Sequence, residues 1–577
     1  MDQVKQWRAR CIFVAVLLLM LAAGCVIMPG NAFALYLVKA QDMPVLVMLS
    51  FAILGAGFWP PSWSLPRHFP RWWALLLAGL VLAALLAWGT YAIMGNYPLS
   101  RDEDMVLFDM AVYDKARLAV PLAPQWRPYA HALVPAFLLN DQMPIGLVSG
   151  YLPVNSLLRL AFSKIADPAW YNPLLVIAGG AALLDIARRS FGPDDRACWV
   201  VLLIYVLSAQ MLANAMTPFS MTGHMALNLI WLAAFLRGGK WGHTAAILTA
   251  FLAIGLHQLV FHPMFAAPFL LWRLREGQWR IVLVYAAAYA AIVGWWGYFP
   301  MLASAQAAQA AGQASEDNIL TEKLLPLIVN HDPAAFALMI LNLMRFAAWQ
   351  NFAMLPLFAA AIPVARRERG LARAMLLGIV IWLIFLTLVI PRQGNGWGFR
   401  YLHGYLGSFA LLAGYGYREL ERHLHRKADG LVLLLSGVTA VAAIPLLFAG
   451  AYRYVEPHVA LDRFVASQPG PMVVIDDQES ASIDRKWAMN PVDQVRNLPD
   501  LSNRPLRFSS YHLSAAMLAE LCRRGPVTVI TRADQHRQGF GLNVPERSPE
   551  FDKLVAAAGR QVPGCFRKAV YAGQPRG

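Results

Sequence analysis

Long apolar runs separated by short polar seams dominate this sequence. An α-helix needs about 20 mainly apolar residues to cross a bilayer, and some spans are shorter or tilted. We predict about thirteen membrane-crossing helices near residues 11–28, 44–60, 72–94, 169–187, 197–214, 224–237, 243–257, 262–275, 281–299, 350–365, 374–391, 402–418 and 431–450. The pattern therefore indicates an all-α polytopic membrane domain.

Two further apolar stretches, 143–163 and 334–348, do not fit the same scheme. If both crossed, the basic seams would no longer all lie on one side of the membrane. Pro144 and Pro153 interrupt the first stretch, which suits a segment that does not cross. We predict that both stretches lie along the outer surface or re-enter the membrane.

The composition supports the membrane assignment. The chain has 577 residues, of which 58% are hydrophobic and 14% charged, and its mean hydropathy is +0.47. A soluble globule of this size is far less apolar. Residues 11–28 follow a basic start and resemble a signal peptide, but no small-residue cleavage site follows, so we predict a retained helix.

The net charge of +15 would suggest a nucleic-acid partner in a soluble protein. Here Lys and Arg gather in the seams between spans, for example at Arg188 and Arg189 and at Arg366 and Arg367. The positive-inside rule places such seams in the cytoplasm. We therefore predict no nucleic-acid partner and a cytoplasmic N-terminus.

This topology places 95–168 outside as a first large loop and 451–577 outside as a tail. The tail contains strand-like runs at 471–476 and 525–531 and a helix-like run at 510–524. We predict a transmembrane domain over 1–450, which includes the first loop, and a small extracytoplasmic α/β domain over 451–577.

The tail contains two of the five cysteines, Cys522 and Cys565. In an oxidising compartment these residues can form a disulfide. The alternative is two free thiols. The other three cysteines lie within or beside apolar spans, where packing explains them.

Three adjacent acidic residues, Asp102, Glu103 and Asp104, follow the span 72–94. Carboxylates at a membrane interface are candidates for chemistry. A simpler reading is that Ser100 and the acids only cap a helix, because carboxylates favour the positive end of the helix dipole. A divalent cation is a further alternative, although adjacent carboxylates on a helix point in different directions.

Polar residues also recur in three later turns that the topology assigns to the outer side. These residues are His224, then His257 and His262, and finally Arg392, Arg400, Tyr401 and His403. Arginines at the outer end of a helix pair run against the positive-inside rule and suit a phosphate. We expect these turns and the acidic triplet to share one wet cavity, as a membrane enzyme site requires.

The histidine pair has a competing interpretation as a metal site. His257 and His262 are five residues apart, whereas ligands on one helical face are three or four apart, and Pro263 follows directly. We therefore predict no metal at this pair. Trp397 and its neighbouring glycines have a second interpretation, as an interfacial aromatic residue in a flexible turn.

Together, these features resemble the GT-C superfamily of integral membrane glycosyltransferases, including bacterial aminoarabinose transferases of lipid A and protein O-mannosyltransferases. In that superfamily a long first extracytoplasmic loop begins with an acidic pair, which Asp102-Glu103 or Glu103-Asp104 matches here. The stretch YLPVNSLLRLAFSKIADPAWYN at 151–172 is similar to the family's proline-containing segment, and ARRSFG follows at 187–192. The resemblance covers roughly residues 72 to 200.

The resemblance implies a transferase that moves a sugar from a polyprenyl-phosphate donor to a glycan, lipid or protein acceptor in the cell envelope, and the Arg-rich, Ala-rich composition suggests a bacterium. Asp102 would be the base that takes the acceptor proton, with Glu103 or Asp104 as its alternate or orienter. Arg392 and Arg400, with Tyr401 and His403, would bind the phosphate. His224, His257 and His262 would shape the donor or acceptor pocket, and no cofactor is required.

The sequence also departs from the family pattern. It has no Lys-Pro-Pro motif and no tyrosine three residues after the acidic pair, since Phe108 and Tyr113 are the nearest aromatic residues. Acceptor and donor sugar therefore stay open. The rival functions are a transporter or flippase of lipid-linked substrates, for which we detect no inverted repeat, and a non-catalytic envelope assembly protein.

Overall fold

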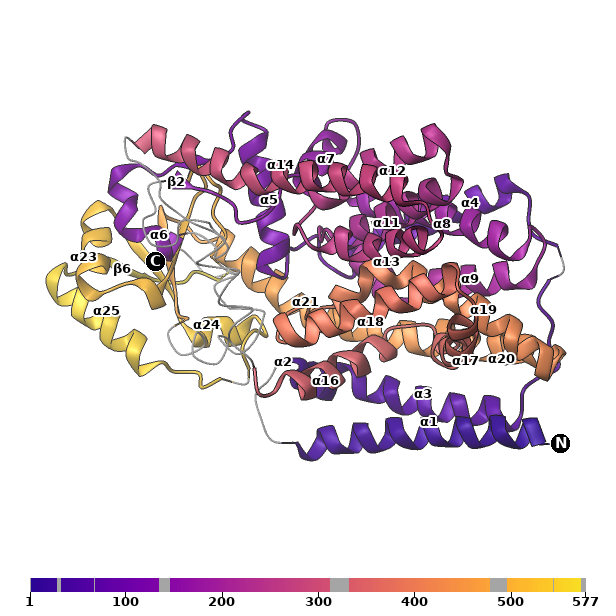
Figure 1. Cartoon of the computed structure of the whole chain (residues 1–577). Helices are drawn as coiled ribbons and strands as arrows, with labels where there is room; N and C mark the ends of the chain where they lie inside the picture. Colours follow the sequence, from indigo (N-terminus) through magenta and orange to yellow (C-terminus); the bar gives the residue numbers. More distant parts are fainter. Residues whose placement is uncertain are drawn as a thin grey trace. The chain divides into compact units, whose positions relative to one another are not determined.

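The computed structural model describes residues 2–28, 33–66, 68–133, 146–311, 332–477, 495–542 and 544–571. The chain divides into two compact units (Figure 1). Unit 1 comprises residues 1–91, 165–297 and 318–451, and unit 2 comprises 92–164, 298–317 and 452–577. Unit 2 therefore combines the first large loop with the C-terminal tail.

The regular secondary structure in the described part of unit 1 consists of helices alone. Its helices, including turns of 3₁₀ and π type, are α1 (Asp2–Ile27), α2 (Phe33–Leu37), η1 (Val38–Asp42), α3 (Met43–Phe58), α4 (Trp72–Ala92), η3 (Pro168–Trp170), α8 (Tyr171–Phe191), α9 (Arg196–Val206), α10 (Ala209–Ala215), α11 (Met221–Arg237), α12 (Gly239–Ile254), α13 (Phe261–Arg275), α14 (Trp279–Ala311), α16 (Ala335–Ala348), α17 (Met354–Arg367), α18 (Leu371–Val389), η5 (Arg400–Tyr405), α19 (Leu406–Leu424), α20 (Arg426–Val438), η6 (Thr439–Ala443) and α21 (Ile444–Ala466). The last residues of α4, α14 and α21 belong to unit 2. Helices α1 and α3 lie side by side (Figure 1).

Each predicted span coincides with one or more of these helices, but the count of thirteen crossings is supported only in part. Six described helices are long and apolar enough to cross a membrane, or seven if α9 and α10, which meet at a bend of 52°, form one broken span. Helices α11, α12 and α13 have 17, 16 and 15 residues, fewer than the roughly 20 of a straight crossing. The chain is thus a multi-pass membrane protein by the length and composition of its helices.

Helix α11 shows how unit 1 is packed. Nearly all its residues are buried, as expected for a helix that is apolar on all sides and surrounded by other helices. Trp231 stacks on Phe235 within the helix at 4.8 Å between ring centroids and meets Phe265 of α13 edge-on at 6.1 Å. These aromatic contacts hold α11 and α13 beside each other. They therefore also fix the positions of His224 on α11 and His262 on α13.

Unit 2 contains a four-stranded parallel sheet. Its elements in chain order are α5 (Arg101–Tyr113), β1 (Val120–Pro121), η2 (Pro124–Tyr129), α6 (Ala130–Leu133), β2 (Gly146–Leu147), α7 (Val154–Ser163), β3 (Met472–Ile475), β4 (Leu506–Ser509), η8 (Ser510–His512), α23 (Ala515–Arg524), β5 (Val527–Ile530), α24 (Arg532–Arg537), α25 (Pro549–Gln561) and β6 (Phe566–Lys568). The strand order is β4-β3-β5-β6, and Val473 of β3 pairs with Arg507 of β4 and Thr528 of β5. The strands expected within 471–476 and 525–531 are thus β3 and β5.

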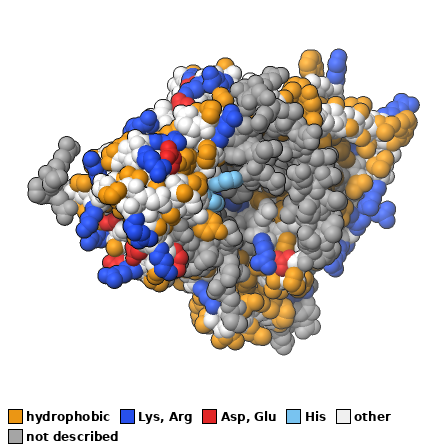
Figure 2. Space-filling view, turned by 90° about the vertical axis from the view of Figure 1, so that its left-hand side faces the viewer, with side chains coloured by type: hydrophobic (Ala, Val, Ile, Leu, Met, Phe, Trp, Pro, Cys, Tyr) orange, Lys and Arg blue, Asp and Glu red, His pale blue; other side chains and the backbone are white. Residues whose placement is uncertain are grey.

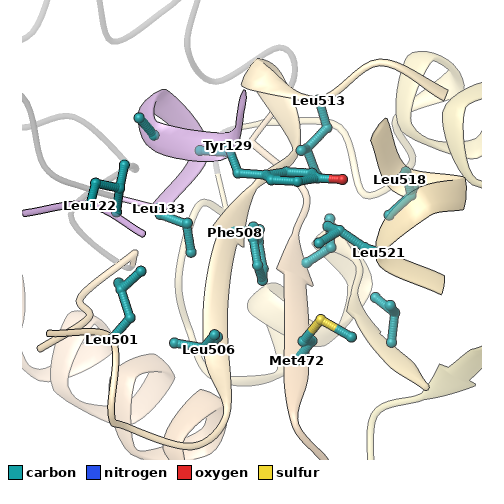
Figure 3. Close-up of a cluster of buried hydrophobic side chains, with 14 of the residues drawn as sticks. Leu122, Tyr129, Leu133, Met472, Leu501, Leu506, Phe508, Leu513, Leu518 and Leu521 are labelled. Carbon is teal, nitrogen blue, oxygen red and sulfur yellow. The ribbon is translucent and has the colours of Figure 1, made fainter. Parts of the chain in front are cut away.

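The first loop and the tail share one hydrophobic core (Figure 3). Phe508 of β4 is fully buried and meets Tyr129 of the first loop edge-on, with ring centroids 6.0 Å apart. The Tyr129 hydroxyl donates to the carbonyl of Met517 at 3.1 Å. Because burial of an aromatic side chain stabilises a core strongly, the sheet of the tail holds the loop segment in place.

Cys522 at the end of α23 and Cys565 before β6 form a disulfide. Of the two alternatives left open by the sequence, the disulfide is therefore confirmed. The remaining cysteines, Cys11, Cys25 and Cys198, are free and buried.

Lys and Arg side chains are interspersed with acidic and hydrophobic ones on the side where α23 and α25 lie (Figure 2).

The stretch 143–163 does not form one long helix. Residues 143–145, including Pro144, lie outside the described residues, and the remainder forms β2 and the ten-residue α7. A helix of that length is too short to cross a bilayer. Helix α16, over most of the second stretch, has 14 residues and is likewise short.

Candidate functional site

The acidic triplet lies in the first turn of α5. Ser100 is the N-cap: its hydroxyl accepts from the backbone N–H of Glu103, and the Glu103 carboxylate accepts from the backbone N–H of Ser100 at 2.7 Å. This reciprocal pair is a capping box. Glu103 is 1% exposed, so its carboxylate serves the helix end, as the simpler reading of the sequence proposed for this region.

The two neighbouring carboxylates point to other partners. Asp102 is half-buried and accepts a hydrogen bond from the Tyr151 hydroxyl at 2.6 Å. Asp104 forms an ion pair with Arg496 of the tail at 3.0 Å. The three acids thus have three different environments, because successive side chains on a helix point in different directions.

Burial changes the acidity of the carboxyls farther along α5. Burial raises the pKa of Asp104 above its ordinary value, although the Arg496 guanidinium acts in the opposite direction. Burial also raises the pKa of Asp109 well above its ordinary value, against the smaller effect of the Ser149 and Ser156 hydroxyls that donate to it. Perturbed carboxyls of this kind are common near functional sites.

The polar turn before α19, residues 391–400, is a loop held in place by hydrogen bonds from α10. Gly398 has φ of +72°, and a Cβ there would lie 2.4 Å from Oε1 of Gln210, so only glycine fits. The Gln210 amide donates to the carbonyl of Phe399 at 3.0 Å and accepts from its backbone N–H at 3.2 Å. Asn214 donates to the carbonyl of Trp397. This segment is therefore not the flexible turn that its glycines suggest.

A buried ion pair that the sequence analysis missed also supports this loop. Arg345 of α16 and Asp42 of η1 are both fully buried and lie 2.9 Å apart. Arg345 also donates to the carbonyl of Gly396, and Trp349 donates to Asp42 at 2.7 Å. A single arginine in the apolar run 334–348 was the available signal, since charges in apolar segments are paired and functional.

The two arginines expected to bind phosphate differ in environment. Arg392 is exposed and paired with Asp332. Arg400 is buried, its guanidinium lies 4.0 Å from the centroid of the Phe219 ring, and its Nε donates to the carbonyl of Asn395. Tyr401 donates its hydroxyl to Gln393 at 2.9 Å. Arg400 is thus the better placed of the two for a ligand inside the apolar unit.

The four predicted histidines gather in unit 1. The ring centroids of His224 and His257 are 6.3 Å apart, and Asn228, which contacts His262, also donates to the carbonyl of Gly404 next to His403. His262 is held on both sides, by Asn228 at 2.7 Å and by the Tyr289 hydroxyl at 2.9 Å. The buried rings of His224 and His403 have no hydrogen-bond partner for either nitrogen within the described residues.

Within the described residues, no group of three or more His, Cys, Asp and Glu side chains is arranged to hold a metal ion. The clustered histidines of unit 1 are instead surrounded by aromatic rings: Phe261 lies 5.3 Å from His224, 5.7 Å from His257 and 5.2 Å from Tyr401. Neutral imidazoles each offer one donor and one acceptor. Such a cluster suits hydroxyl groups.

The predicted site residues are divided between the two units. Asp102, Glu103 and Asp104 belong to unit 2, whereas the arginines, Tyr401 and the histidines belong to unit 1. The shared cavity that we expect for the two sets stays a prediction.

No family model and no curated protein matches the chain. Among solved structures, ArnT from Cupriavidus metallidurans in the apo state has a TM-score of 0.48 and 11% identity over 84% of this chain and 90% of that chain. The same ArnT bound to undecaprenyl phosphate has a TM-score of 0.47 and 11% identity over 74% and 86%.

Arabinosyltransferase EmbB from Mycobacterium smegmatis has a TM-score of 0.31 and 15% identity over 65% of this chain and 34% of that chain. Likenesses of this degree do not assign an activity to this chain.

Proposed function

We propose that the chain is a GT-C-type glycosyltransferase of the bacterial inner membrane. It moves a sugar from a polyprenyl-phosphate donor to a glycan, lipid or protein acceptor on the periplasmic side, with inversion and without a cofactor. The observation that carries the proposal is Asp102: it is half-buried, lies at the positive end of α5 and is oriented by the Tyr151 hydroxyl, whereas its two neighbours serve the cap and the ion pair with Arg496.

In the proposed reaction, Asp102 takes the proton of the acceptor hydroxyl as that oxygen attacks the anomeric carbon of the donor. The bond from the anomeric carbon to the phosphate oxygen breaks, and the polyprenyl phosphate leaves with the electron pair. Arg400 neutralises the departing phosphate, as a guanidinium does for an oxyanion. Arg392, Tyr401 and the four histidines bind the rest of the donor or the acceptor.

The proposed orientation places the N-terminus in the cytoplasm and the tail in the periplasm. The disulfide between Cys522 and Cys565 supports this orientation, because disulfides persist in oxidising compartments and are rare in the cytoplasm. The basic seams between the apolar segments support it as well.

Replacing Asp102 by asparagine tests the proposal. Asn keeps the size and the hydrogen bond to Tyr151 but cannot accept a proton, so sugar transfer should fall by about 10²- to 10⁴-fold, the range of a general base. The matched control is Asp114→Asn, at the other end of α5, where the carboxylate is exposed and paired with Lys164. Transfer is measured with purified chain, polyprenyl-phosphate-linked sugars and membrane extracts as the acceptor source.

Equal transfer by the two variants would remove Asp102 as the base. No transfer by the unaltered chain with any donor, together with movement of lipid-linked substrate across a vesicle membrane, would favour the flippase alternative. Neither activity would favour an envelope assembly protein.

A further inference from the structure

Unit 2 contains a cavity of about 270 Å³ between α5 and the segment that leads into β4. Helix α5 contributes Asp104, Leu107 and Ala111 to its wall, and the other wall includes Arg496 and Arg504. Asp102 does not line it. Small-molecule sites commonly measure about 300 to 1,000 Å³, so this cavity has room for one headgroup and not for a polyprenyl chain.

Three arginines line this cavity, and only two of them have carboxylate partners among the described residues. Arg496 pairs with Asp104 at 3.0 Å and with Asp462 at 3.7 Å. Arg507 pairs with the same Asp462. Three guanidinium groups therefore face two carboxylates, which leaves one positive charge in excess.

The excess charge belongs to Arg504. This side chain lines the cavity, and its Nη1 donates to the carbonyls of Leu501 at 3.1 Å and Asn503 at 2.7 Å. These bonds orient the guanidinium, and no other described residue pairs with Nε and Nη2, which form an adjacent pair of donors. Such a pair matches two oxygens of a phosphate or carboxylate.

We propose that this cavity binds an oxyanion, either a phosphate or a carboxylate, on a headgroup of the cell envelope. Arg504 binds the oxyanion through two hydrogen bonds, and Arg496, on the same wall, contributes while it keeps its ion pair with Asp104 of α5. Leu107 and Ala111 provide an apolar wall against which the carbon skeleton of the headgroup packs. The proposal does not depend on the chain being a glycosyltransferase, because neither Asp102 nor any residue of unit 1 takes part.

The test titrates purified full-length chain in neutral detergent with inorganic phosphate or pyrophosphate and follows binding by calorimetry. We expect saturable binding that weakens by roughly tenfold or more in Arg504→Gln, because a charge-assisted hydrogen-bond pair is lost. The control is Arg523→Gln, an exposed arginine of α23 that pairs with Glu520 and does not line the cavity. Its affinity should equal that of the unaltered chain.

A second arm replaces the soluble anion by nanodiscs that contain phosphatidic acid, with phosphatidylcholine nanodiscs as the reference. Binding in this arm alone, and only with Arg504 present, identifies a lipid headgroup; binding of phosphate identifies a soluble or glycan-borne oxyanion. Leu107→Trp, which fills the cavity without a change of charge, should abolish either. Equal affinity of Arg504→Gln and the unaltered chain, or no saturable binding in either arm, overturns the proposal.

The same titration on Asp102→Asn separates this site from the proposed activity. Oxyanion binding should persist there at unchanged affinity whether or not sugar transfer is lost. A loss of oxyanion binding in Asp102→Asn would show that the cavity and the Asp102 carboxylate form one site and would contradict the separation argued here.

Discussion

At the scale of single residues, the acids of α5 show how one short sequence serves several purposes. Glu103 completes the capping box, Asp104 pairs with the tail, and Asp102 lies beside Tyr151. The sequence RDED predicts a charged first turn, and it predicts the cap, because Ser100 precedes Glu103 by three residues. It could not reveal which carboxylate is held by which partner, since Tyr151 and Arg496 are 49 and 392 positions away.

Asp109 should make the stability of unit 2 depend on pH. Burial raises its pKa well above the ordinary value, which is about 3.9. At a pH between the ordinary pKa and the raised pKa of the folded state, the folded state binds more protons than the unfolded state. The unfolding free energy is therefore greatest at low pH and falls as the pH rises towards the folded-state pKa. Asp109→Asn cannot ionise, although its carbonyl still accepts from Ser149. It should therefore lack this decline.

The measurement compares thermal unfolding of unaltered chain and Asp109→Asn between pH 4 and pH 8, with limited proteolysis of unit 2 as the readout. The difference in stability should grow in favour of the variant as the pH rises. Asp114→Asn, whose carboxylate is exposed, is the control and should follow the unaltered chain. Parallel curves for Asp109→Asn and the unaltered chain would contradict the prediction.

At the scale of elements, the loop 391–400 is the best-defined part of the candidate site in unit 1. The backbone of Gly396 and Phe399 is held by Arg345 and Gln210, which come from α16 and α10. Both helices therefore help to set the position of Arg400 through this loop. The loop belongs to the site because it sets the position of the guanidinium, not because it is free to move.

Replacing Gly398 by alanine tests this element. The Cβ would lie 2.4 Å from Gln210 at a φ of +72°, and a non-glycine residue in this conformation costs about 1–2 kcal/mol before any clash. We expect the loop to shift, Arg400 to move, and the KM for the lipid-linked donor to rise. Gly437→Ala on α20, where a Cβ meets nothing within 4 Å, should leave KM unchanged.

The readout is the initial rate of transfer as a function of donor concentration, together with the elution profile of the purified variants. A raised KM with an unchanged profile supports the role of the loop. An unchanged KM in Gly398→Ala would show that the segment does not position the donor.

The elements also show where sequence patterns were sufficient. Apolar runs located the helices of unit 1, because a bilayer demands such runs, and short runs rich in β-branched residues located β3 and β5. Patterns could not give the bend between α9 and α10, which follows local capping by Ser208. They also could not pair Asp42 with Arg345, which are 303 positions apart.

At the scale of the whole molecule, the chain departs from a simple division into a membrane part and a tail. Unit 2 takes residues from the first loop, from the end of α14 and from the tail. Gln306 of α14, for example, accepts from the backbone N–H of Leu118 at 2.7 Å. A hydrophobicity plot separates segments by composition, whereas compact units are defined by contacts between segments distant in sequence.

The disulfide should be the main covalent support of unit 2. It closes a segment of 43 positions between the end of α23 and the start of β6, and both sulfurs lie in the core shared by the first loop and the tail. Its removal should cost about 2–4 kcal/mol through the greater freedom of the unfolded chain. In the paired variant Cys522→Ser/Cys565→Ser, unit 2 should be cleaved by protease at lower urea concentration than in the unaltered chain.

Reductant separates this effect from any role of the buried thiols in unit 1. Dithiothreitol should lower the urea midpoint for cleavage of unit 2 in the unaltered chain and leave that of the paired variant unchanged, because the other cysteines are already free. If the first loop depends on the tail for its fold, the segment from α5 to α6 should become cleavable at the same midpoint as α23, since Tyr129 and Phe508 share one core. Cleavage of the tail with the first loop still protected would show that the loop folds without the sheet, and that the tail does not hold α5 in place.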